Sequence, residues 1–158
     1  TTFLKSIPRF YVEDKKIGRI HGGPYQMKMA LEDGIHGREP DIFFVAAENL
    51  GRLDEQFLEG AADLVIEVIS PESIVRDTVD KFEEYESAGV KEYWIIDYNR
   101  RTANFYGYDE NQKYKLLIPT ADEKFESRVI EGLWIKTDWL WKQPLPGLKE
   151  VLKEWELV

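Results

Sequence analysis

Residues 62–70 (ADLVIEVIS) constrain the fold of this chain more than any other segment. Their β-branched and apolar side chains predict a buried strand, which Pro71 is expected to end. Glu67 lies in the middle of this apolar run, where an uncompensated carboxylate is costly or is forced to take up a proton. We therefore expect a cation, a basic side chain or hydrogen bonds to compensate Glu67. A structural ion pair, or a strand whose Glu67 face is wet, is the alternative to a functional site.

The segments after this strand predict a mixed α/β domain. A helix is expected from about residue 72 to residue 88, with Gly89 as its C-cap. Four side chains at helical spacing are expected to form its buried stripe, namely Val75, Val79, Phe82 and Tyr85. Residues 90–97 (VKEYWIID) predict a second buried strand. A strand–helix–strand unit with two buried strands predicts a parallel pair with a right-handed crossover.

Shorter segments complete the predicted sheet and its covering layers. The expected elements are a helix over residues 3–16, a strand or hairpin over 19–30 broken at Gly22, Gly23 and Pro24, a polar loop over 32–39, a strand over 41–46, a hairpin formed by 104–108 and 114–118, a strand within 133–141, and a helix from about Leu148. A chain of 158 residues fits a single domain, which we expect to span residues 1–158. Because the first residue is Thr rather than Met, the N-terminal part of the domain is expected to be truncated.

Asp41 is the residue that gives Glu67 a functional interpretation. If the strands over residues 41–46 and 62–69 are antiparallel neighbours, the start of the first lies opposite the end of the second. Asp41 is five residues before Ala46, and Glu67 is five residues after Ala62, so the two carboxylates are expected to lie side by side. Like charges at this separation favour a bridging divalent cation. Taken alone, Asp41 also fits a strand-entry or turn residue after Pro40.

Lys81 is the third candidate. It lies on the predicted crossover helix, beside the apolar stripe rather than opposite it. An ammonium group that reaches back toward Glu67 could position a water molecule and stabilise negative charge developing on a phosphate. The alternative is an i,i+4 surface pair with Asp77, which would contribute only a few tenths of a kcal/mol.

Four short motifs, taken together, resemble a known family. They are Arg38-Glu39-Pro40-Asp41, residues 62–71 (ADLVIEVISP), Asp77 with Lys81 and Tyr85, and residues 88–97 (AGVKEYWIID). Their order and spacing are similar to those of the Uma-two-type family of endonucleases, which belongs to the PD-(D/E)XK nuclease superfamily. The resemblance runs from about residue 15 to residue 140. Members of this family carry about 30 further residues before the first helix.

The resemblance implies a restriction-endonuclease-like fold, with a mixed central β-sheet flanked by helices and an additional β-meander. It also implies a Mg²⁺ or Mn²⁺ site and hydrolysis of phosphodiester bonds. Asp41 is similar to the first metal-binding aspartate and Glu67 to the acidic residue of the second half-motif, and the backbone carbonyl of Val68 would complete the metal sphere. The lysine usual two positions after that acid is replaced by Ile69. Family members resemble this pattern, with the lysine moved to the following helix, where Lys81 stands.

Other polar residues favour structural interpretations. Asp63 and Asp77 could be outer-shell ligands, although surface acids are the better interpretation. Asp97 and Ser70 are expected to cap turns, and His21 and His36 to be polar loop residues without the spacing of metal ligands. Three tryptophans could stack on bases, although their alternation in a predicted strand first indicates core or a dimer interface: Trp134, Trp139 and Trp141.

Composition bears on the partners. The net charge of −9 argues against tight non-specific binding of nucleic acid, unless a local basic groove or bound cations reverse the sign. The chain lacks cysteine and any apolar stretch long enough to span a bilayer, so we expect a cytoplasmic protein without a membrane partner. We expect a homodimeric endonuclease with DNA favoured as substrate. A catalytically silent scaffold that keeps the nuclease fold is the alternative, and a glycosidase that uses the paired carboxylates fits less well.

Overall fold

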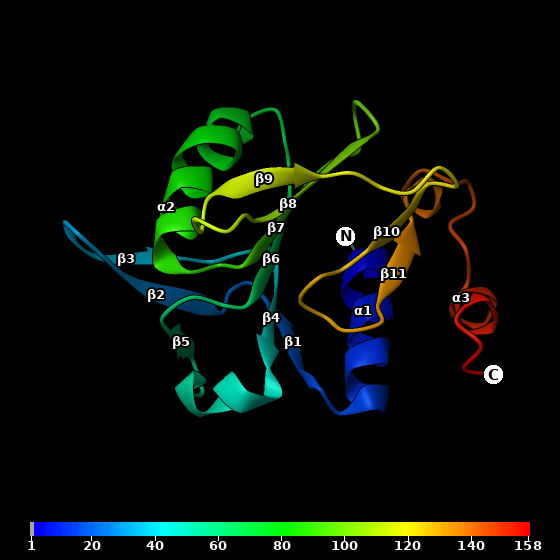
Figure 1. Cartoon of the computed structure of the whole chain (residues 1–158), viewed down its shortest axis with the longest axis horizontal. Helices are drawn as coiled ribbons and strands as arrows, with labels where there is room; N and C mark the ends of the chain where they lie inside the picture. Colours follow the sequence, from blue (N-terminus) through cyan, green and yellow to red (C-terminus); the bar gives the residue numbers. More distant parts are fainter. Residues whose placement is uncertain (1) are drawn as a thin grey trace.

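A six-stranded mixed sheet forms the centre of the protein, seen in a computed structural model that describes residues 2–158 apart from the side chain of Asp77. Its strands, in spatial order, are β1 (Gly18–Gly22), β4 (Ile42–Ala46), β6 (Leu64–Val68), β7 (Glu92–Asp97), β8 (Thr102–Tyr108) and β9 (Tyr114–Leu117). Only β6 and β7 pair in parallel, and the other four neighbouring pairs are antiparallel. The predicted parallel pair and the predicted β8–β9 hairpin are therefore confirmed. Figure 1 shows the sheet between its covering layers.

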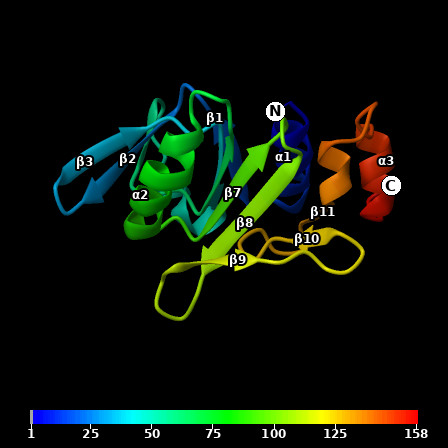
Figure 2. The ribbon, with the colours of Figure 1, turned by 90° about the horizontal axis from the view of Figure 1, so that it is seen from above.

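Two small sheets and several helices surround this centre. The small sheets are β3-β2-β5, built from β2 (Gln26–Leu31), β3 (Gly34–Arg38) and β5 (Phe57–Glu59), and the ribbon of β10 (Lys124–Glu126) and β11 (Trp134–Lys136). The helices are α1 (Thr2–Lys15), α2 (Lys81–Ala88) and α3 (Leu148–Glu154), the 3₁₀ turns η1 (Ala47–Arg52) and η3 (Thr137–Leu140), and the π turn η2 (Arg76–Asp80). Figure 2 shows the β2–β3 hairpin at one end of the molecule and α3 at the other. No helix within residues 2–158 has both the length and the apolar character needed to cross a bilayer.

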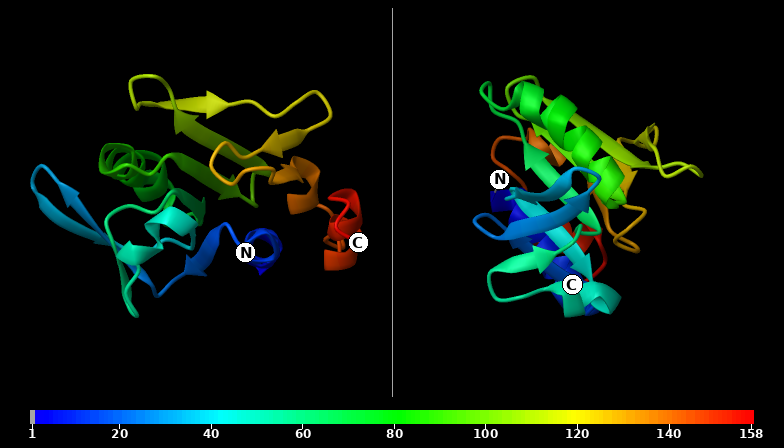
Figure 3. Two further views of the ribbon diagram at one scale, coloured as in Figure 1. Left: turned by 60° about the horizontal axis from the view of Figure 1, so that its bottom comes forward. Right: turned by 90° about the vertical axis from the view of Figure 1, so that its left-hand side faces the viewer.

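The two faces of the central sheet carry separate cores, because successive side chains of a strand point to opposite faces. Ile42 and Phe44 of β4 and Leu64 and Ile66 of β6 pack with α1 and the C-terminal segments. Phe43, Val45 and Val65, which alternate with them, pack instead with α2 and the three-stranded sheet. Figure 1 accordingly shows α1 and α2 on opposite sides of the sheet, and the left panel of Figure 3 shows β1 and β9 at its opposite edges.

The register of β4 against β6 brings the candidate residues together. Ile42 lies opposite Ile66, and Phe44 lies opposite Leu64. Continued by one position, this register sets Asp41 opposite Glu67, as predicted from an antiparallel pairing of the two strands. Both side chains then belong to the face of the sheet that α2 covers.

The π turn η2 changes which side of the crossover helix is buried. The N–H of Lys81 donates to the carbonyl of Arg76, five residues earlier, so the ring contains one residue more than an α-helical ring. Side chains before the turn are therefore out of phase with those after it. Val75 and Val79 are 68% and 48% exposed, which contradicts the predicted stripe, while Tyr85 and Lys81 are buried. The predicted C-cap is confirmed, since Gly89 has a φ of 106°.

Two further predictions are corrected by the tertiary structure. Residues 34–38, predicted as part of a polar loop, form strand β3 because β2 supplies a backbone partner. The predicted strand in residues 133–141 ends at Lys136 and continues as η3, which buries Trp139. Trp134 and Trp141 pack against the same core, so the core interpretation of the tryptophans is confirmed.

Candidate metal centre

The carboxylates of Asp41 and Glu67 each accept a hydrogen bond from a backbone amide of the neighbouring strand segment, at the end of the β4–β6 pair. The amide of Asp41 donates to Oε1 of Glu67 at 2.8 Å, and the amide of Val68 donates to Oδ2 of Asp41 at 2.8 Å. Glu67 is 1% exposed, whereas Asp41 is exposed to solvent. The pair therefore combines a deeply buried carboxylate with one that opens the site to solvent.

Lys81 reaches this pair from the helix above. It is the first residue of α2, and its ammonium group donates to Oε2 of Glu67 in a buried ion pair. The Lys81 residue is 9% exposed, so the contact is shielded from water. The structure thus brings together the three predicted side chains. The expected i,i+4 pair with Asp77 lies outside the described side chains, as does the proposed outer-shell role of Asp77.

Burial dominates the electrostatics of Glu67. Removal from water raises the pKa of its carboxyl from 4.5 to about 7, and the negative charge of Asp41 acts in the same direction. The ammonium of Lys81 and the amide of Asp41 lower this pKa, but less than burial raises it. Glu67 thus lacks full compensation for its charge, which favours the approach of another cation.

The donor set fits a hard divalent cation. The side chains of Asp41 and Glu67 and the carbonyl of Val68 offer only oxygen, which Mg²⁺ prefers. Among the described side chains, no group of three or more acids or histidines could hold a metal ion. Two carboxylates suffice for Mg²⁺, which usually keeps several of its waters in protein sites. Asp41, Glu67 and Val68 are therefore the residues that could hold it.

Ile69 is the residue that stands in place of the lysine implied by the motif resemblance. Two residues after Glu67, it points to the same face of the sheet and packs on the core beneath α2. It also lines a hollow of about 490 Å³ together with Phe82 of α2 and Ile95 of β7. Its apolar side chain cannot donate to a phosphate or a water molecule. Lys81 of α2 is the cation that pairs with Glu67.

Three polar residues near the strand ends have structural partners. Asp63, expected as a surface acid, is 3% exposed and accepts hydrogen bonds from the amide of Ala46 and the side chain of Asn49. It lies four residues from Glu67, about 13 Å along the strand, and is remote from the site. Asp97 accepts from the amide of Arg100 and Ser70 pairs with Ser73, so the predicted turn roles of Asp97 and Ser70 are confirmed.

Both histidines lie in strands rather than in the predicted loops. His21 of β1 stacks on Tyr25, with ring centroids 4.9 Å apart. Its Nε2 is buried and has no hydrogen-bond partner among the described residues. His36 of β3 lies 2.6 Å from Asp33 and 3.3 Å from Glu84, measured from its Nε2 and Nδ1. The two histidines therefore belong to separate surroundings, and neither joins Asp41 and Glu67.

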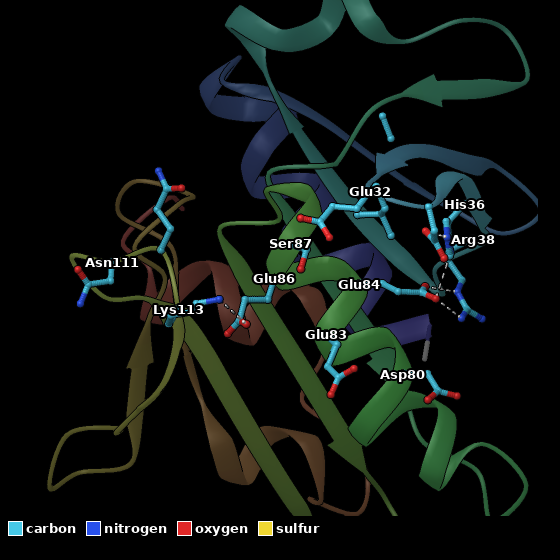
Figure 4. Close-up of a pocket in the computed structure, with 14 residues that line it drawn as sticks. Glu32, His36, Arg38, Asp80, Glu83, Glu84, Glu86, Ser87, Asn111 and Lys113 are labelled. Carbon is cyan, nitrogen blue, oxygen red and sulfur yellow. Dashed lines mark hydrogen bonds and ion pairs between the residues drawn. The ribbon is translucent and has the colours of Figure 1, made fainter.

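An acidic hollow of about 870 Å³ lies between the β2–β3 hairpin and α2 (Figure 4). Its lining contains six carboxylates, namely Glu32, Asp33, Asp80, Glu83, Glu84 and Glu86. Figure 4 shows Glu84 pointing toward Arg38, whose Nε and Nη2 donate to it at 2.7 and 2.9 Å. Sequence reasoning missed this contact, which ties β3 to the helix that carries Lys81. A sequence separation of 46 positions left no local signal for this contact.

Replacing Arg38 with methionine is expected to lower the free energy of unfolding by about 1 kcal/mol at neutral pH, because a charge-assisted bidentate contact is lost. Arg38 holds the pKa of Glu84 below its ordinary value. The advantage of the wild type should therefore be present at pH 7 and fade as acid protonates Glu84. Urea unfolding at pH 7 and pH 3 measures both effects. Arg9→Met, which breaks an exposed pair with Glu13, is the control and should cost less.

Comparison with solved structures identifies the type of fold. A crystal structure described as a putative nuclease belonging to DUF820, from Anabaena variabilis, superposes with a TM-score of 0.71 at 18% sequence identity. The match covers 88% of this chain and 76% of that one. The architecture is accordingly a nuclease-type, restriction-endonuclease-like α/β fold.

The sequence comparison identifies the family. Residues 2–138 match the Uma2 family, which is described as putative restriction endonuclease. The chain belongs to this family, and the resemblance seen in its motifs is confirmed. Among curated proteins, none matches the chain.

Proposed function

We propose that this protein is a divalent-metal-dependent endonuclease that hydrolyses phosphodiester bonds in nucleic acid, with DNA as the favoured substrate. The observation that carries the proposal is the buried carboxylate of Glu67, set opposite Asp41 and paired with Lys81. Membership of a family of putative restriction endonucleases supports the same chemistry.

Asp41, Glu67 and the carbonyl of Val68 would hold Mg²⁺ or Mn²⁺. Such an ion, when bound, lowers the pKa of coordinated water and offsets negative charge on the phosphate. The amides of Asp41 and Val68 keep the two carboxylates in place through their 2.8 Å hydrogen bonds. Side chains held in this way need no rearrangement when charge develops in the reaction.

Lys81 would orient the attacking water and stabilise the anionic phosphate. The positive charge that Lys81 holds beside Glu67 acts on any anionic group that approaches the two carboxylates. Burial of the Lys81 side chain limits competition from solvent and strengthens its electrostatic effect. The exposed carboxylate of Asp41 lies on the open side, from which a phosphate can approach.

The metal assignment is tested by calorimetry with Mn²⁺. Asp41→Asn and Glu67→Gln are each expected to weaken Mn²⁺ binding at least about tenfold, because each removes an anionic oxygen ligand. Glu39→Gln, which removes the same charge from an exposed neighbour, is the control and should bind as the wild type does. Unchanged Mn²⁺ affinity in both site variants would refute the ligand assignment.

The reaction is tested by incubating the protein with supercoiled plasmid, single-stranded DNA and RNA, in Mn²⁺ or in EDTA. Cleavage that requires Mn²⁺ and is lost in Glu67→Gln supports the endonuclease. The absence of cleavage on all three substrates favours a scaffold that keeps the fold, for which the net charge of −9 is the supporting feature.

A further inference from the structure

Positive charge is concentrated at the start of this acidic chain. Residues 1–28 contain six lysines and arginines and two acids, a net charge of +4. Since the whole chain carries −9, the remaining 130 residues carry −13. The acidic side chains that line the hollow beside α2 belong to this second part. The surface built by α1 and β1 is therefore the place where a polyanion meets the least repulsion.

Part of this positive charge lies next to the candidate metal centre. Gly22, at the end of β1, lies against the backbone of Asp41, because a Cβ on Gly22 would be 2.4 Å from the Asp41 carbonyl oxygen. The same Cβ would be 3.4 Å from Nζ of Lys5. The ammonium of Lys5 thus lies close to the place where the backbone of Gly22 meets the backbone of Asp41.

The charge continues from Lys5 along the edge of the sheet. Strand β1 is the outermost strand of the central sheet, and α1 runs beside it (Figure 1). A hollow of about 440 Å³ at the far end of β1 is lined by Arg9, Lys16 and Arg19, together with Glu13. We call Lys5, Arg9, Lys16 and Arg19 the basic strip. At about 1.5 Å per helical residue, Lys5 and Lys16 are about 16 Å apart along α1.

The cations of the basic strip share one electrostatic environment. Burial lowers the pKa of His21, and the positive charges of Arg19, Arg9 and Lys5 lower it further. Three side chains from a helix and a strand thus act on one imidazole. This agrees with the positions given by the hollow and by Gly22.

These cations are also available to a ligand. Among the described side chains, no carboxylate forms an ion pair with Lys5, Lys16 or Arg19. Arg9 pairs with Glu13 at 2.8 Å, but both side chains are more than half exposed, so this pair is weak and exchangeable. By contrast, several lysines elsewhere are paired with acids: Lys81, Lys91, Lys113, Lys136 and Lys142.

We propose that the basic strip binds the phosphates of a nucleic-acid strand and leads that strand along β1 to Asp41. A length of about 16 Å corresponds to about five phosphates at 3.4 Å per nucleotide of one strand. Four cations in this length match the charge of such a segment. The choice of nucleic acid as the polyanion rests on the proposed endonuclease function, whereas the binding itself does not require cleavage.

The test measures binding without catalysis. Fluorescence anisotropy in EDTA follows a labelled single strand and a labelled duplex of the same sequence, from 50 to about 200 mM salt, a range in which phosphate contacts cause large affinity changes. The strip variant combines Lys5→Gln, Arg9→Gln and Arg19→Gln. Its affinity should fall at least tenfold at 50 mM salt. The slope of log K against log salt should become shallower by about 2–3, since each lost phosphate contact contributes about 0.7–0.9.

The matched control combines Lys115→Gln, Lys149→Gln and Lys153→Gln, three exposed lysines outside the basic strip. Both triple variants have a net charge of −12, because each loses three positive charges from −9. Equal weakening by the two variants, or no binding by the wild type at 50 mM salt, would overturn the basic strip. Arg19→Gln alone, at an exposed strand position, is the substitute variant if the triple variant folds poorly. It should reduce the slope of log K against log salt by about 0.8.

The outcome is separable from that of the proposed function. If only the strip variant loses binding and the wild type does not cleave, the basic-strip proposal stands and the proposed endonuclease function is overturned. If the wild type shows metal-dependent cleavage and both triple variants bind equally, the proposed endonuclease function stands and the basic-strip proposal is overturned.

Discussion

Replacing Lys81 with methionine is expected to lower the rate of metal-dependent cleavage by about 10²–10³-fold, because a preorganised donor to the transition state is lost. Methionine is similar in length and cannot donate, so the change removes the charge while keeping much of the packing. Single-turnover cleavage at saturating Mn²⁺ measures the effect, with calorimetry to show that Mn²⁺ still binds. An unchanged rate would remove Lys81 from the catalytic group.

The same variant should also lose stability without metal. The ammonium of Lys81 is the basic side chain paired with Glu67, which is 1% exposed. Removal of one partner of a buried ion pair typically costs about 3–5 kcal/mol when the other remains charged. Because the pKa of Glu67 should rise further without Lys81, the loss should be larger at pH 8 than at pH 5. Added Mn²⁺ should recover part of it.

Lys91→Met is the matched control for Lys81→Met. Lys91 pairs with Asp63 at 3.5 Å, but its side chain is 57% exposed. Solvent screens the exposed Lys91 ammonium, and the buried Asp63 keeps its hydrogen bonds from Ala46 and Asn49, so this pair should contribute only about 0–1 kcal/mol. Lys91→Met should therefore leave both cleavage and the pH dependence of unfolding near the wild-type values. A comparable loss of stability in the two variants would show that burial does not determine the effect.

Glu67→Gln is expected to remove a large pH dependence of stability. Folding raises the pKa of Glu67 from 4.5 to about 7, so between these values the folded protein holds a proton that the unfolded chain releases. Raising the pH through this window therefore destabilises the wild type, and a shift of this size corresponds to at most about 3 kcal/mol. Glutamine has no proton to release. The stability of the wild type relative to Glu67→Gln should consequently fall from pH 5 to pH 8.

Urea midpoints at pH 5, 6.5 and 8 measure this difference in metal-free buffer. Glu83→Gln, an exposed position on the same helix, is the control and should follow the wild type across the series. Parallel curves for the wild type and Glu67→Gln would mean that the carboxyl of Glu67 does not change its proton affinity on folding.

The central part of the fold could be predicted because its signals are local. The run of apolar and β-branched residues identifies β6, and the period of two along a strand determines which side chains share a face. Equal offsets of Asp41 and Glu67 along two strands assumed to be antiparallel predicted that they lie opposite each other, which the β4–β6 register confirms. The catalytic and metal-binding roles of these residues stay predictions.

Other parts were not predicted because their local signals are weak or misleading. Strand β3 contains two glycines and no apolar alternation, and it forms because β2 offers a backbone partner. The stripe that included Val75 and Val79 assumed a regular α-helix, whereas the π turn before Lys81 shifts the phase of the helix by one residue. Asp63 was expected at the surface. Its burial was not foreseen because its hydrogen-bond partners, Ala46 and Asn49, are distant in the sequence.

The sequence by itself determined the buried strand β6 and the positions of Asp41 and Glu67 along their strands, because these follow from the pattern of neighbouring residues. The structure supplied the antiparallel pairing of β4 with β6 that sets the two carboxylates opposite each other. Only the tertiary structure decided which side chains of other elements reach them. It placed Lys81 on Glu67, Lys5 beside the backbone of Asp41, and Arg38 on Glu84. Long flexible cations have many partners within reach in an unfolded chain. The packing of helices on the two faces of the sheet selects one partner for each.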